Sequence, residues 1–285
     1  MLGEQTINVG RIEFLSSLPS DQSQTSIRIR ESVRDYIRDE NVPIETNLTQ
    51  VESADEFFDA IERIVVQATE DGQGVVLQID AHGAQQGIEL SSGDLVTWDS
   101  LKEALTKLNR ATRFNLLVVL STCYGAHMIG ASSPLEESPF WGIVGPKEEI
   151  EAGPLMDGLV AFYKTWIEER SGDRAVDALN EHAEGEDPFY FTTAERFFGN
   201  RYLDFLKKNQ INAQTIADQA RERHNKMKKK NGPWRRPSVA AVKRQVWADH
   251  LGFFEQCKST YFMIDQFPEV SDRIGIELED VKSQL

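Results

Sequence analysis

The sequence predicts an α/β fold with a mostly parallel sheet, followed by a helical C-terminal region. Two short runs, at residues 75–79 and 116–120, are nearly continuous in apolar and β-branched residues, as in strands buried on both faces of a sheet. A helical pattern separates these runs, which suggests a right-handed crossover. Strand signals fade beyond residue 188. We therefore expect an α/β domain over residues 1–184 and a mostly helical extension, regulatory or recognition in role, over residues 185–285.

The first elements are a strand at residues 12–15 and a helix at residues 26–38, separated by a polar turn. A second helix follows Ser53, which has capping-box spacing to Glu56. Its apolar stripe ends at Gly72, a residue that commonly stops helices. The first buried strand comes directly afterwards.

Later elements continue the same pattern. A helix with Leu101 and Leu105 on one face lies between the two buried strands, and a third apolar run at residues 140–144 precedes another amphipathic helix. The C-terminal helices are expected to break at Asn209, Gly232-Pro233 and Pro268.

The charge of the 285 residues is unevenly distributed. The chain has a net charge of −15, and its 40% hydrophobic content is that of a globular protein rather than a disordered one. Residues 221–244 contain ten Lys/Arg and one Glu, so this segment carries +9 and the remainder −24. The acidic remainder argues against a nucleic-acid or anionic-lipid surface.

Only two cysteines occur, Cys123 and Cys257, which is too few for a disulfide framework or a four-cysteine metal site. The N-terminus lacks a basic start before a long apolar run, and no apolar run approaches 18 residues. We expect a soluble, cytoplasmic protein that does not bind membranes.

The two buried strands end in residues suited to nucleophilic catalysis. Asp80 and His82-Gly83 follow the first strand, and Ser121 and Cys123 follow the second. Carboxyl ends of neighbouring parallel strands line one crevice, so His82 and Cys123 can meet there. An imidazole can take the proton of the thiol or hold the thiolate. The backbone N–H groups of Gly83 and Cys123 are the candidate oxyanion donors.

A plainer interpretation fits the same spacing. His82-Gly83 can be an ordinary turn at a strand end, and Cys123 can be a small buried residue, as free cysteines commonly are.

The two motifs resemble a known family. VVLQIDAHGAQQGIEL, at residues 75–90, resembles the histidine region of caspase-like cysteine proteases, and VVLSTCYGA, at residues 118–126, resembles their cysteine region. The S-x-C form is closer to the CHAT branch than to the Q-A-C-x-G form of true caspases. The resemblance covers residues 1–184 and implies a caspase-like α/β/α sandwich.

The resemblance also implies a reaction. Cys123 would attack the scissile carbonyl and form an acyl-enzyme, and His82 would protonate the leaving amine, without a metal or cofactor. Asp80, two residues before His82, is a candidate to orient or electrostatically bias the imidazole; a solvated carboxylate at the strand end is the plainer alternative. By family analogy Ser121 would help line the pocket for the residue before the cut, with Arg11 and Glu13 as further candidates.

The other histidine and cysteine residues give little support to a metal site. His127 lies four residues after Cys123, a helical spacing that suits a metal pair, but two further ligands would be needed. The other histidines and Cys257 share no short spacing with them. We interpret His127 as a packing or surface residue and Cys257 as a buried helix residue.

The basic segment at residues 221–244 admits several interpretations. A solvated helix face followed by a flexible loop is the plainest. Alternatively, Lys228, Lys229, Lys230, Arg235 and Arg236 form a surface for a small anionic activator or an acidic protein partner, or the loop is exposed to proteases.

Three functions therefore compete. The leading one is a signal-activated cysteine endopeptidase acting on a protein or peptide; its resemblance to bacterial stress and anti-phage proteases supplies the biological context. The second is a caspase-like pseudoenzyme or binding module that recognises an anionic ligand or a protein. The third is a cysteine hydrolase acting on another acyl or amide substrate.

Overall fold

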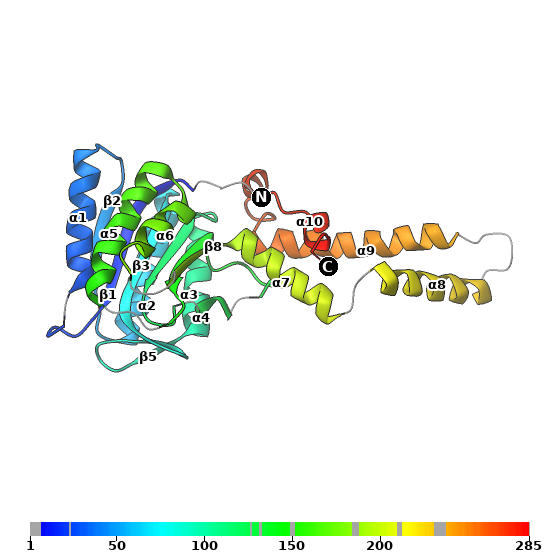
Figure 1. Cartoon of the computed structure of the whole chain (residues 1–285), viewed down its shortest axis with the longest axis horizontal. Coiled ribbons are helices and arrows are strands. Elements are labelled where there is room, and N and C mark those ends of the chain that lie inside the picture. The colour runs from blue at the N-terminus through cyan, green and yellow to red at the C-terminus, as the bar shows by residue number, and fades with distance from the viewer. Residues whose placement is uncertain are drawn as a thin grey trace. The chain divides into compact units, whose positions relative to one another are not determined.

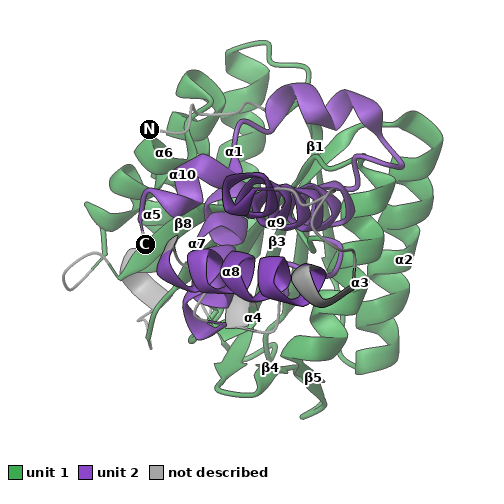
Figure 2. Cartoon of the chain, turned by 90° about the vertical axis from the view of Figure 1, so that its right-hand side faces the viewer, with its two compact units in different colours: residues 1, 3–132, 138–194 green, residues 2, 133–137, 195–285 purple. Residues whose placement is uncertain are grey.

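The chain forms two compact units in the computed structural model (Figure 2). The first unit holds residues 3–132 and 138–194, and the second holds residues 133–137 and 195–285. The structure describes residues 7–22, 24–125, 127–130, 133–148, 152–183, 188–209, 213–230 and 238–284.

The first unit is built on a sheet whose strands are β1 (Val9–Ser17), β2 (Glu45–Gln50), β3 (Gly74–Ala84), β4 (Gly87–Glu89), β5 (Leu95–Thr97), β6 (Leu116–Ser121), β7 (Gly142–Pro146) and β8 (Phe189–Thr193). The main order is β2-β1-β3-β6-β7-β8. Figure 1 labels β1, β2, β3 and β8 of this sheet. Strands from β2 through β7 in this order run parallel, and β8 pairs antiparallel with β7. β4 continues from β3 as a hairpin and pairs with β5.

Helices cover both faces of this sheet. They are α1 (Thr25–Asp39), α2 (Ala54–Asp71), α3 (Trp98–Ala111), α4 (His127–Gly130), α5 (Ala152–Glu169) and α6 (Gly172–Asn180). α1, α5 and α6 pack in series on one face, where Tyr163 of α5 donates a hydrogen bond to Gln78 of β3 at 2.8 Å. α2 and α3 pack together on the other side (Figure 2).

Local sequence explains where α2 begins and ends. The Ser53 hydroxyl accepts a hydrogen bond from the Glu56 amide at 3.3 Å, which caps the first turn. Phe57 and Ile61 are buried on the stripe that faces the core. Gly72 follows the last turn with a φ of +66°, a left-handed conformation that glycine adopts without steric cost.

Two strands of the main order, β2 and β8, were absent from the sequence prediction. β2 is a half-exposed edge strand with the polar sequence ETNLTQ, so it lacks the continuous apolar run of a buried strand. β8 adds an antiparallel strand after residue 188, where we expected strands to have ended. The first unit consequently extends to residue 194 rather than to residue 184.

The second unit is helical. Its helices are α7 (Ala194–Lys208), α8 (Ala213–Lys230), α9 (Val239–Tyr261), the 3-10 helix η1 (Pro268–Arg273) and α10 (Leu278–Lys282). The first residue of α7, Ala194, belongs to the first unit. Aromatic side chains form its core: the Phe198 ring lies 5.5 Å from Phe254 and 5.3 Å from Tyr261. α8 packs along α9.

The α/β class, the mostly parallel sheet and the helical C-terminal region are confirmed. α7 ends next to Asn209 as expected, whereas α9 ends at Tyr261, before the expected break at Pro268. Gly232-Pro233 lies outside the described residues. Among the helices that are described, none is both long and apolar enough to span a membrane.

Candidate active site

The ends of β3 and β6 meet at the carboxyl edge of the sheet. The two strands pair in parallel from Val75 opposite Leu116 to Asp80 opposite Ser121. His82 and Cys123 each come two residues after this last pair, His82 still within β3 and Cys123 in the turn that follows β6. Beyond Asp80, β3 turns into the hairpin with β4, in which His82 pairs with Glu89.

Gly83 is in close contact with the backbone of Cys123. A Cβ atom added at Gly83 would lie 2.5 Å from the Cys123 N and 2.6 Å from its carbonyl carbon, and closer still to its carbonyl oxygen. Distances this short would force the backbone to move, so only glycine fits here. The structure thus brings together the His82-Gly83 and Cys123 motifs, which are 40 residues apart in sequence.

A tight turn follows Cys123. Tyr124 has a φ of +59°, an uncommon conformation for a residue with a large side chain. The Gly125 amide donates a hydrogen bond to the Thr122 carbonyl at 3.1 Å, and the Tyr124 amide donates one to the Glu148 carbonyl at 3.3 Å. These bonds hold the turn, and such strained turns cluster at functional sites.

Both candidate catalytic side chains are accessible. His82 is exposed and Cys123 is partly exposed. Cys257, in contrast, is 4% exposed on α9, and burial raises the pKa of its thiol. Of the two free cysteines, Cys123 is therefore the one open to reagents.

Asp80 is buried at the end of β3 rather than solvated. The residue is 3% exposed, so a solvated carboxylate is wrong. Its Oδ2 accepts hydrogen bonds from Thr25 Oγ1 at 2.5 Å, Ser26 Oγ at 2.7 Å and the Ser26 amide at 3.2 Å. Among the described hydrogen bonds of Asp80, none joins it to His82. Burial raises the pKa of Asp80, while these hydrogen bonds and the charge of His82 lower it.

The hydrogen-bond partners of Asp80 indicate its structural role. Thr25 and Ser26 are the first residues of α1, where helix amide groups lack partners of their own. Asp80 therefore fastens the start of α1 to the end of β3. Its candidate role in orienting His82 would act through electrostatics and through the position of the strand.

Ser121 lies beside Asp80 on the same face of the sheet, because directly paired residues of parallel strands point to the same side. It is 6% exposed, and its hydroxyl has no hydrogen-bond partner among the residues described. Its family-based role in a substrate pocket stays a prediction.

Arg11 and Glu13 are wrong as candidates for the substrate pocket. Arg11 pairs in register with Val75, at the beginning of β3 rather than at its end. Its guanidinium is buried with Asp71 at 2.5 Å and Glu13 at 3.5 Å. The sequence revealed that these residues share a strand but not which end of the sheet they occupy.

His127 is exposed at the first position of α4, whereas Cys123 lies in the turn before that helix. The two residues therefore do not share a helical face, and the spacing argument for a metal pair is wrong. The interpretation of His127 as a surface residue is confirmed.

The basic segment is only partly described. Lys228, Lys229 and Lys230 end α8, but their side chains lie outside the described residues, as do Arg235 and Arg236 altogether. Earlier cations of α8 are exposed and ion-paired, Arg221 with Asp218 at 2.9 Å, Arg223 with Asp249 at 2.8 Å and Lys226 with Glu222 at 2.6 Å.

Sequence reasoning missed the polar residues at the end of β1. Ser16 pairs with Asp80, and Ser17 accepts a hydrogen bond from the Ser91 amide at 3.0 Å. The signal was the change from the apolar IEFL run to Ser-Ser, which parallels the polar endings of β3 and β6.

Residues 25–138 match the Peptidase C13 family. The matched stretch is less than half of the chain, and it contains both His82 and Cys123. A search of curated proteins finds none that matches. The family match supports a cysteine peptidase with a caspase-like α/β fold, while the specific likeness to the CHAT branch stays a prediction.

Proposed function

We propose that the protein is a cysteine endopeptidase in which His82 and Cys123 form the catalytic dyad. The observation that carries the proposal is the close approach of Gly83 to the Cys123 backbone at the carboxyl ends of two neighbouring parallel strands. The similarity of residues 25–138 to the Peptidase C13 family supports the same chemistry.

In the proposed reaction, the Cys123 thiolate attacks the scissile carbonyl carbon and forms a C–S bond. The C–N bond then breaks as the His82 imidazolium gives its proton to the leaving amine. Water, deprotonated by the now neutral His82, hydrolyses the thioester and regenerates the thiol. These steps need no further co-reactant.

The amides of Gly83 and Cys123 are the proposed oxyanion donors. Gly83 pairs with Ile88 in the β3–β4 hairpin, between the pairs Ala84–Gly87 and His82–Glu89. Hydrogen-bonded and non-hydrogen-bonded pairs alternate in antiparallel ladders, and the pair closing a two-residue turn is hydrogen-bonded. The Gly83 amide is then unused by β4 and available to a developing oxyanion.

Covalent labelling of the full chain by an acyloxymethyl-ketone peptide tests the dyad. We expect labelling at Cys123, no labelling or peptide-library cleavage in Cys123→Ala, and a labelling rate lower by roughly 100-fold or more in His82→Ala. Cys257→Ala is the matched control and should label normally, because that thiol is buried.

Retained cleavage in Cys123→Ala would exclude the proposed nucleophile. Labelling without cleavage of any library peptide would favour a binding module, and cleavage restricted to non-peptide acyl or amide compounds would indicate another cysteine hydrolase.

A further inference from the structure

His82 lies in a small antiparallel sheet that continues from the end of β3. In this sheet β3 pairs with β4, and β4 pairs with β5. His82 is directly opposite Glu89 of β4, and Glu89 is directly opposite Leu95 of β5. Because residues in direct register point to the same face of a sheet, these three side chains form one row across it.

The two faces of this small sheet differ in exposure. In the neighbouring row, Ile88 is 0% exposed and Val96 is 1% exposed. His82 and Glu89 are exposed, and Leu95 is 46% exposed. This alternation is that of an antiparallel sheet with one buried face and one solvent face. The Glu89 carboxylate therefore shares the solvent face with the His82 imidazole.

Two hydrogen bonds from Trp98 hold the hairpin that carries both residues. The Trp98 indole donates to the Gln85 carbonyl at 2.9 Å, and the Trp98 amide donates to the Gln86 carbonyl at 3.1 Å. Both carbonyls belong to the turn that joins β3 to β4, and Trp98 is 6% exposed at the start of α3. The register between His82 and Glu89 is thus supported by a buried side chain.

The Glu89 side chain is long enough to reach the imidazole. Directly paired residues have Cβ atoms about 5 Å apart, and the glutamate carboxylate lies two bonds beyond its own Cβ. Within the described part of the chain, this carboxylate forms no ion pair and no side-chain hydrogen bond. It is therefore available when the imidazole becomes charged, since contacts between catalytic groups often tighten only in the substrate complex.

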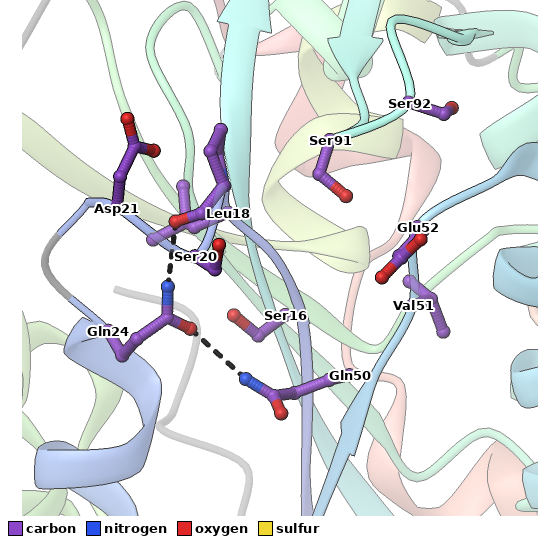
Figure 3. A pocket seen from close by; sticks show the side chains of 11 residues that line it. Ser16, Leu18, Ser20, Asp21, Gln24, Gln50, Val51, Glu52, Ser91 and Ser92 are labelled. Carbon is purple, nitrogen blue, oxygen red and sulfur yellow. Dashed lines mark hydrogen bonds between the residues drawn. The ribbon is translucent and has the colours of Figure 1, made fainter.

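The other carboxylates in this part of the first unit have different surroundings. Asp80, two residues before His82, is buried and hydrogen-bonded to the start of α1. Burial raises the pKa of Asp80, which favours its uncharged form. Asp21 and Glu52 lie in the wall of a polar pocket of about 490 Å³ (Figure 3), and none of the residues that line this pocket belongs to the β3–β4 hairpin. Glu89 is the exposed carboxylate in direct register with the imidazole.

We propose that Glu89 is a positioning residue whose carboxylate pairs with the His82 imidazolium and orients the ring for proton transfer to the leaving amine. The inference rests on the proposed His82/Cys123 dyad and adds a residue to it. A third group that orients the base recurs in other nucleophilic sites. The imidazolium forms when His82 accepts the Cys123 proton, and Glu89 stays ionised and exchanges no proton.

Kinetics of Glu89→Gln test this role. Because both groups are exposed, solvent screens the pair, and we expect kcat to fall by only about threefold to fivefold. KM should stay within about twofold, since the imidazolium forms during the reaction rather than on binding. Loss of the negative charge destabilises the imidazolium, so the alkaline limb of the kcat/KM profile should move to lower pH by about half a unit.

Two further variants and a change of salt separate electrostatics from structure. Glu89→Asp keeps the charge and should keep the alkaline limb of the wild type. Glu103→Gln, which removes an exposed carboxylate of α3, is the matched control and should behave as the wild type. The difference between Glu89→Gln and the wild type should shrink at about 1 M NaCl. An unchanged kcat and alkaline limb in Glu89→Gln, or a loss that high salt leaves intact, would overturn the inference.

A measurement of proximity separates this inference from the proposed function, because it needs no catalysis. In NMR spectra of full-length Cys123→Ala, we expect a nuclear Overhauser effect between the ring protons of His82 and the Hγ protons of Glu89. The effect should weaken when Glu89→Gln removes the charge. Its absence would overturn the role of Glu89 even in an active peptidase. Its presence, in a protein whose wild type is neither labelled nor active, would support the pairing and overturn only the peptidase.

Discussion

At the residue scale, Gly83 is the position where a single added methyl group would disrupt the candidate site. Because a Cβ there would come within 2.5 Å of the Cys123 amide nitrogen, Gly83→Ala must push the ends of β3 and β6 apart. We expect kcat/KM to fall by roughly 100-fold or more, as on loss of an oxyanion donor. The measurement is peptide cleavage together with the rate of Cys123 labelling.

Gly252→Ala provides the matched control. A Cβ added at Gly252 in α9 has no neighbour within 4 Å, so the same substitution should leave cleavage unchanged and stabilise the helix by up to about 1 kcal/mol. Normal activity in Gly83→Ala would show that the strand ends tolerate separation, and would remove the geometric basis of the proposed site.

The candidate catalytic residues could be predicted from sequence because each one ends a run of buried, β-branched residues. The surroundings of Asp80 could not. Its partners, Thr25 and Ser26, lie more than 50 residues away, and only the packing of α1 on the sheet brings them to the carboxylate. Arg11 shows the same limit, since its ion-pair partner Asp71 is the last residue of α2, 60 residues along the chain.

At the element scale, the signals that failed were those of strands at the sheet edge. β2 is a half-exposed edge strand that is polar at every position except Leu48, and a run of polar residues is shared with loops. β8 has the sequence FYFTT, whose aromatic residues and threonines favour strands, but it follows an acidic, proline-containing stretch. Its antiparallel pairing with β7, which makes β8 the last strand of the sheet, forms only in the tertiary structure.

The contact between α1 and β3 leads to a prediction about pH and stability. Burial raises the pKa of Asp80 above its ordinary value of 3.8, so the folded protein keeps this proton at pH values where the unfolded chain has released it. Raising the pH through this window therefore lowers the stability of the wild type. Asp80→Asn cannot ionise, so its free energy of unfolding should rise relative to the wild type across the window, by at most about 1.4 kcal/mol per pH unit.

Urea unfolding at a series of pH values from 3 upward measures this difference. Thr25→Val is the informative companion, because the Thr25 hydrogen bond lowers the pKa of Asp80. Its loss should extend the window to higher pH. If the free energy of unfolding of Asp80→Asn instead falls relative to that of the wild type as the pH rises, the folded state favours the ionised carboxylate and the prediction is wrong.

At the scale of the whole molecule, the net charge of −15 conceals a division between an acidic chain and one basic segment. Three cations of that segment, Arg221, Arg223 and Lys226, already have acidic partners on α8 and α9. Exposed pairs of this kind contribute little to stability, but they reduce the local positive field. Lys228, Lys229, Lys230, Arg235 and Arg236, whose side chains lie outside the described part of the chain, stay the candidates for binding an anionic activator.

Replacing these five residues by glutamine should weaken binding of inorganic tripolyphosphate at least tenfold, because the segment falls from +9 to +4. Calorimetric titration at low and high salt measures this loss, and the wild-type affinity should itself fall with salt as charges are screened. The variant with Arg221, Arg223 and Lys226 replaced should lose less, since those cations are already paired. Tripolyphosphate should also change the Cys123 labelling rate of the wild type but not of the five-residue variant. Binding that survives the five substitutions would make the segment an ordinary solvated surface, and binding without any change in labelling would make it an anion site with no regulatory role.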